Sequence, residues 1–280
     1  MARSLPSAPT LARPRLDLSG PTLLAALERV ISGCEQSNGV EGYVEALKLR
    51  GIVFQQTFAR AAPNPPDVKY FMKLAAFMPT VRRRIGPYLE PSAYPAFANA
   101  CVALISARHD PLAVDERIAA FTAFFPRDNQ HRWVRDLAAE LLHAVDPERY
   151  PLMCRWIWDA KANTGVLREI WHGDIDRETL HVEDGYATFV MLREELSQFL
   201  ASNGIFQNVL YYVDLLCAQV YAEYVSAQGG SYLRADFSSA DDPIHYVRRL
   251  LGLDGVRVKG DVSEPQPGLL QGNSNATGGA

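Results

Sequence analysis

Two pairs of residues in this sequence have the spacing with which a helix can offer a metal ion a carboxylate and an imidazole together. They are Glu140 with His143 and Glu169 with His172. Residues three positions apart lie on the same face of a helix. Each pair could therefore give one oxygen and one nitrogen ligand to the same metal ion, and a metal centre is one hypothesis for this chain.

Two such pairs, with one glutamate from each of two further helices, form the di-iron or di-manganese carboxylate sites of four-helix bundles. Glu45, Glu195 and Glu223 are the acids that could complete the set. The order of the elements counts against this interpretation. In those bundles a helix with a lone glutamate separates the two paired helices, whereas the pairs here are near neighbours in the chain. A metal-dependent enzyme holding iron or manganese is therefore an alternative hypothesis.

The segment 155–172 has the densest mixture of aromatic and polar residues in the chain. The Asn-Thr-Gly sequence at 163–165 predicts a break between two helices, with Thr164 as the N-cap of the second. The start of a helix next to Lys161 and Arg168 would attract an anion, because its free backbone N–H groups and its dipole favour negative charge.

Two of the three tryptophans of this segment lie within a helix expected at 148–162. Trp156 and Trp158 are two positions apart, so they cannot both face the core from one helix, and we expect one of them to be partly exposed or to lie at a domain seam. In the alternative interpretation the tryptophans belong to the core and the basic residues are solvated. The candidate ligand or partner site comprises Trp156, Trp158, Lys161, Asn163, Thr164 and Arg168.

A third cluster, Arg82, Arg83 and Arg84, could bind phosphate groups. It makes a nucleic-acid-associated protein a further alternative. The apolar side chains of the preceding segment 67–78 are expected to pack in the core. The segment therefore lacks the polar recognition face of a helix-turn-helix. The formal net charge of −4 also argues against a chain that coats nucleic acid. We therefore do not expect a nucleic-acid partner.

The elements that must position these residues are helices. Apolar residues recur with helical spacing through most of the chain, and Asp67 is expected to cap one helix. Asp146-Pro147 has the form of another helix start. The expected helices, about ten in all, cover 21–33, 41–60, 68–78, 92–107, 112–125, 129–145, 148–162, 187–202, 206–227 and 243–252.

These helices predict an all-α fold in one compact domain over residues 21–260, with at most a minor two-stranded β appendage near 231–259. The chain has 280 residues, 48% hydrophobic and 21% charged, which is typical of a globular protein. Residues 1–20 and 261–280 are rich in proline or in glycine and serine, so we expect a disordered N-terminal arm and a disordered C-terminal tail.

The four cysteines include no Cys-x-x-Cys pair, so the sequence encodes no local zinc or redox motif. They lie in apolar surroundings and are expected to be buried thiols of a cytoplasmic protein. No apolar run approaches the ~20 residues that span a bilayer, so no membrane association is expected.

Helix 206–227 is apolar nearly all round, so it should be central to the fold or should pair with another subunit. Its Asp214 is expected on an exposed polar stripe. The sequence contains no phosphate-binding loop, nucleophile elbow or catalytic triad. Our first hypothesis is a non-catalytic accessory or scaffold protein that needs no cofactor. Its partner would be another protein or a second copy of itself, in a homo-oligomer.

Overall fold

The computed structural model describes residues 16–35, 39–60, 65–106, 113–173, 179–227 and 243–254. In these ranges the chain is helical, and the only extended pairings are two isolated β-bridges. The all-α fold is therefore confirmed, with ten α-helices in the described residues. They are α1 (Gly20–Cys34), α2 (Gly39–Arg60), α3 (Val68–Ala76), α4 (Tyr94–Ser106), α5 (Val114–Ala123), α6 (Trp133–Val145), α7 (Val166–Glu169), α8 (Tyr186–Ser202), α9 (Val209–Ala227) and α10 (Pro243–Leu250), with short 3₁₀ turns η2 (Gly86–Leu89) and η4 (Asn129–His131).

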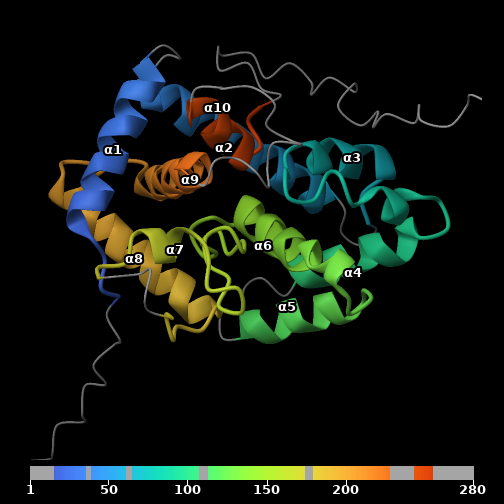
Figure 1. Ribbon diagram of the computed structural model, residues 1–280. Helices are drawn as coiled ribbons and strands as arrows, with labels where there is room; N and C mark the ends of the chain where they lie inside the picture. The colour runs from blue at the N-terminus through green and yellow to red at the C-terminus, as the bar shows by residue number, and fades with distance from the viewer. Residues whose placement is uncertain are drawn as a thin grey trace, which may run out of the picture.

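Two helices, α6 and α9, lie at the centre of the molecule (Figure 1). Helix α9 packs against α1, α7, α8 and α10, while α6 packs against α2, α4 and α5, and α2 also contacts α9. Every residue of α6 except Arg135 is buried. The buried apolar side chains form one continuous cluster to which all ten helices contribute. The central position expected for helix 206–227 is thus confirmed.

Several helix ends follow the local signals. The Asp67 carboxylate accepts a hydrogen bond of 2.8 Å from the backbone N–H of Lys69, which caps α3. Helix α10 ends just before Gly252, whose positive φ of 70° terminates the helix as expected. In both cases the residues that set the conformation lie next to one another in the chain, which is why a sequence pattern suffices.

The helix expected at 148–162 is absent. Residues 146–165 form a series of turns, and Asp146-Pro147 starts no helix. Pro151 disfavours a helical conformation of the residue before it. The backbone N–H groups of Arg155 and Ala162 are bound by the side-chain carboxylates of Asp136 and Asp159 instead of by helical carbonyls. These tertiary bonds replace the helix.

The described end of the expected N-terminal arm is ordered. Leu16 is buried, and the Ser19 N–H donates to the Ile170 carbonyl at 2.8 Å. Leu18 pairs with Trp171 in a β-bridge. The rest of the arm, the tail at 261–280 and most of the expected appendage at 231–259 lie outside the described residues. The part of that range that is described holds α10.

None of the described helices is long and apolar enough to cross a membrane. All four cysteines are buried and unpaired, as expected. Burial raises the pKa of the Cys34 thiol to about 12, so this sulfur stays protonated and unreactive near neutral pH.

Candidate functional site

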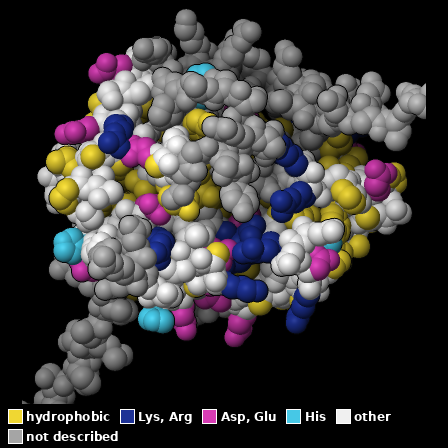
Figure 2. All heavy atoms as spheres, in the orientation of Figure 1, with side chains coloured by type: hydrophobic (Ala, Val, Ile, Leu, Met, Phe, Trp, Pro, Cys, Tyr) yellow, Lys and Arg dark blue, Asp and Glu magenta, His cyan; other side chains and the backbone are white. Residues whose placement is uncertain are grey.

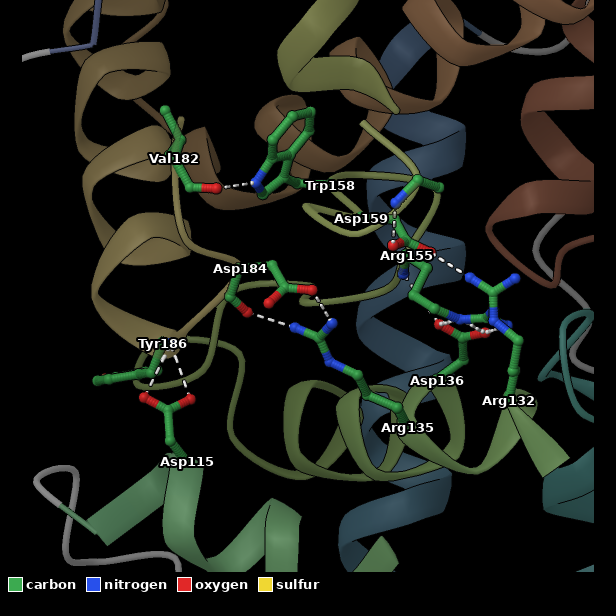
Figure 3. A network of polar contacts seen from close by, with 11 residues as sticks. Asp115, Arg132, Arg135, Asp136, Arg155, Trp158, Asp159, Val182, Asp184 and Tyr186 are labelled. Atoms are coloured by element: carbon green, nitrogen blue, oxygen red, sulfur yellow. Dashed lines mark hydrogen bonds and ion pairs between the residues drawn. The ribbon is translucent and has the colours of Figure 1, made fainter. Parts of the chain in front are cut away.

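The turns that replace the expected helix are held by a network of charged side chains, which Figure 3 shows. Asp136 on α6 accepts the backbone N–H of Arg155 at 2.9 Å and its guanidinium group at 2.7 Å. Asp159 accepts the Arg132 guanidinium at 2.7 Å. Figure 2 shows a group of Lys and Arg side chains near the middle of one face with Asp and Glu side chains among them. The basic groups of the network therefore balance internal acids.

Three members of the proposed tryptophan site, Trp158, Asn163 and Arg168, form hydrogen bonds within the fold. The Trp158 indole N–H donates to the Val182 carbonyl at 3.0 Å. The Asn163 amide donates to the Leu180 carbonyl at 3.0 Å, and its oxygen accepts the guanidinium of Arg168. Thr164 and Lys161 are exposed. The structure therefore does not gather these six residues around one ligand.

Both tryptophans are buried, with exposed fractions of 6% for Trp156 and 0% for Trp158. The expectation that one would be exposed was wrong because the segment is not helical, so alternate side chains can both turn inward.

The expected N-cap of the helix after the break was also wrong. Gly165, not Thr164, is the N-cap of α7, with a φ of 121°. A Cβ there would lie 2.8 Å from the Ile157 carbonyl oxygen. Helix α7 has only four residues, too few to form an anion site.

The first Glu-x-x-His pair lies in the interior. Glu140 forms an ion pair with Arg50 of α2, and both side chains are nearly inaccessible. Burial raises the pKa of Glu140, although the Arg50 charge opposes this. His143 lies 2.9 Å from the Tyr150 carbonyl oxygen through Nδ1 and 3.0 Å from Asp214 through Nε2. Asp214 is therefore buried, and the expectation of an exposed position was wrong.

The second pair lies at the surface. The side chain of His172 is 69% exposed and is 3.7 Å from the Asp17 carboxylate. Among the three additional acids, Glu45 pairs with Lys48 and Glu223 pairs with Arg29. Within the described residues no three His, Cys, Asp or Glu side chains form a group that could hold a metal ion.

The arginine cluster is divided between different surroundings. Arg82 holds the Asp254 carboxylate through two hydrogen bonds of 2.9 and 2.6 Å. Arg84 is exposed. Arg83 lines a pocket together with Arg82. Arg83 is exposed as Arg84 is, whereas Arg82 forms an ion pair within the fold.

This pocket brings together residues from two of the sequence-derived clusters. It has a volume of about 200 Å³ and lies between the turn after α3, the segment around Trp156, α9 and α10. We call it the arginine–tryptophan pocket. Its lining consists of Pro79, Thr80, Arg82, Arg83, Trp156, Tyr221, Ala222, Val225, Tyr246, Arg249 and Leu250.

The arginines of the pocket influence one another electrostatically. Desolvation lowers the pKa of Arg83, and the neighbouring charges of Arg249 and Arg82 lower it further, while Asp254 opposes the shift. Like charges held close together at a partly desolvated site repel one another. A bound anion would relieve that repulsion.

Two polar atoms of the lining residues have no hydrogen-bond partner in the described structure. They are Nε1 of Trp156 and Oγ1 of Thr80, and both are buried. A buried polar group without a partner costs about 1–3 kcal/mol, so native structures seldom retain one without a reason. Here both atoms belong to side chains that line the same pocket. Neither atom has accessible surface in the unliganded protein, so a ligand in the pocket would reach them only after these side chains turn.

A larger hollow lies between α2, the end of α6 and the start of α9. Its two connected parts have volumes of about 780 and 420 Å³ and share Gln55, Pro147, Glu148 and Tyr211. Its buried charges are already matched, since Arg50 pairs with Glu140 and Asp214 with His143. The buried charges of this hollow are therefore compensated within the fold.

Comparison of the chain with protein-family models, with curated protein sequences and with solved structures gives no match. The site is thus defined by its geometry. Sequence reasoning identified Trp156, Arg82 and Arg83 but assigned them to different clusters. It missed Thr80, Tyr221, Tyr246 and Arg249, because no local pattern shows that these residues meet.

Proposed function

We propose that this protein is a non-catalytic binding protein whose arginine–tryptophan pocket takes an organic anion. The observation that carries the proposal is the coincidence of three features in one pocket. Three arginines line it, aromatic side chains form part of its wall, and two buried polar atoms in it lack partners. An apolar pocket with a few convergent polar groups is the usual form of a small-molecule site.

The surroundings of the other candidate residues support binding rather than catalysis. His143 has both ring nitrogens engaged, by Tyr150 and Asp214. Glu140 is held by Arg50. A general base must have a nitrogen or oxygen within reach of the proton that it removes. These two groups are committed to the fold, whereas the pocket retains unused donors.

The proposal is tested by measuring thermal unfolding of the full chain at low salt with a panel of small organic anions and their uncharged analogues. We expect anions to raise the Tm, because a ligand that binds only the folded state stabilises it. Arg83→Gln should abolish the shift. Arg84→Gln is the matched control, since Arg84 is the adjacent arginine and lies outside the pocket lining, and it should leave the shift unchanged. Equal loss in both variants would reject the pocket as the binding site.

A scaffold role through a partner protein or a second copy is the second candidate. Leu24 and Ile31 on α1 are 43% and 45% exposed, and their spacing of seven residues places them on one face of the helix. Leu24→Glu with Ile31→Glu should then shift the mass measured by light scattering toward that of a monomer. We place the protein in the cytoplasm, because its buried, unpaired cysteines suit a reducing compartment.

A further inference from the structure

The size of the arginine–tryptophan pocket restricts what can enter it. A cavity of about 150 Å³ with an apolar lining holds one benzene molecule. The pocket measures about 200 Å³, so it has room for a single six-membered ring with one short substituent. The pocket is open to solvent, so a nucleotide or another multi-ring ligand would be only partly buried in it, whereas sites for drug-sized ligands measure about 300–1,000 Å³.

The wall of the pocket is suited to an aromatic ring. The rings of Trp156 and Tyr221 lie 5.6 Å apart at an interplanar angle of 48°. Tyr246 adds a third ring, and Val225 and Leu250 add aliphatic surface. Tilted or offset contacts between aromatic rings are favourable beyond the burial of their area. A ligand ring would extend this arrangement.

The charged part of the pocket is suited to a carboxylate. The planar guanidinium group matches the two oxygens of a carboxylate in a two-point contact. The chain itself gives an example at the pocket, because Arg82 binds the Asp254 carboxylate in this way. The indole N–H of Trp156 can only donate. Its Nε1 is buried and has no partner, so a small rotation of the indole toward the pocket would give it an acceptor atom on the ligand.

We propose that the pocket binds a small single-ring aromatic monocarboxylate, with its ring against Trp156 and Tyr221 and its carboxylate facing Arg83 and Arg249. This inference rests on the anion-binding function proposed above and adds the ligand class. Trp156 is the specificity-determining residue, since it contributes both a ring and a donor. Thr80 contributes a hydroxyl that can donate or accept.

The test is calorimetric titration of the full chain with benzoate and phenylacetate. Three further probes each lack one feature: cyclohexanecarboxylate has no aromatic ring, benzyl alcohol has no charge, and inorganic phosphate has no ring at all. We expect the aromatic carboxylates to bind at a ratio of one to one, and each of the other probes to bind at least tenfold more weakly. Trp156→Phe, which keeps a ring but removes the N–H donor, should weaken binding at least tenfold.

Trp171→Phe is the matched control, because Trp171 lies outside the pocket lining, and it should bind like the unmodified protein. Circular dichroism of both variants establishes that they are folded. Equal binding of cyclohexanecarboxylate or phosphate would overturn the aromatic inference and leave the anion-binding function standing. A peptide that ends in phenylalanine and binds where the free acids do not would assign the pocket to a protein C-terminus. If no anion binds, both proposals fail.

Discussion

His143 and Asp214 join the two central helices through a buried hydrogen bond of 3.0 Å between Nε2 and Oδ2. The other ring nitrogen of His143 lies 2.9 Å from the Tyr150 carbonyl oxygen. A carbonyl can only accept, so Nδ1 carries a proton. When Asp214 is ionised, Nε2 must also carry one to make its bond. This geometry stabilises the imidazolium form, and it connects α6, α9 and the turn at residue 150.

We predict that this contact makes the protein less stable at alkaline pH. Burial alone lowers the pKa of His143, but the charge and hydrogen bond of Asp214 and the Tyr150 carbonyl outweigh burial and the nearby Arg50 charge. The net pKa is raised, so the folded state holds the proton more tightly than the unfolded chain. The stabilisation is therefore full below a pH of about 6.5 and is lost as the pH rises through the folded-state pKa.

The measurement is the free energy of unfolding in urea between about pH 5.5 and pH 9, for the unmodified protein and Asp214→Asn. The variant lacks the charge that holds the proton. Its stability should therefore fall less over this range than that of the unmodified protein. The same pH dependence in both proteins would show that His143 is not the group responsible.

We predict that the buried Arg50–Glu140 pair contributes little net stability although its disruption is costly. Arg50→Met should lower the free energy of unfolding by about 3–5 kcal/mol, because it leaves a buried carboxylate without a counter-charge. Nε of Arg50 and Oε1 of Glu140 lack partners even in the intact pair. Arg50→Met combined with Glu140→Leu should therefore recover most of the loss. Urea unfolding of the three proteins measures this, and a double variant as unstable as the single one would contradict it.

We predict opposite behaviour for the two basic residues of the tryptophan-rich segment. Lys161→Ala should change the free energy of unfolding by less than about 0.5 kcal/mol, because the side chain is exposed. Arg168→Ala should cost about 1 kcal/mol or more, because it removes a hydrogen bond to Asn163 in a half-buried position. Thermal unfolding of both variants is the measurement. An Arg168→Ala variant as stable as Lys161→Ala would show that this bond does not support the fold.

We predict that Gly252→Ala displaces α10 from the pocket. Gly252 has a φ of 70°, and a Cβ there would overlap the carbonyl oxygen of Phe77. The left-handed conformation alone costs a non-glycine residue about 1–3 kcal/mol, and the overlap adds to this. The Tm should fall, and anion binding should weaken because Tyr246 and Arg249 belong to α10. Gly86→Ala is the control, since no atom lies within 4 Å of a Cβ there. Equal effects of the two substitutions would contradict the prediction.

The sequence by itself determined nine of the ten expected helices and their approximate limits. Apolar spacing depends on residues at most a few positions apart, and capping is equally local, as Asp67 and Gly252 show. It also singled out Trp156 and the Arg82–Arg84 cluster as unusual. These features could be read from the chain because a helix imposes the same short repeat wherever it occurs.

Only the tertiary structure decided the partners of the charged groups. Asp214 contacts His143, which lies 71 residues away in the chain. Asp136 accepts the backbone N–H of Arg155, which the helix favoured by the local pattern would have used. The same holds for the pocket, where Trp156 joins Arg83, a turn after α3 and two later helices. Such contacts depend on how the helices pack. A buried charge without a partner costs more free energy than the small local preference for a helix supplies.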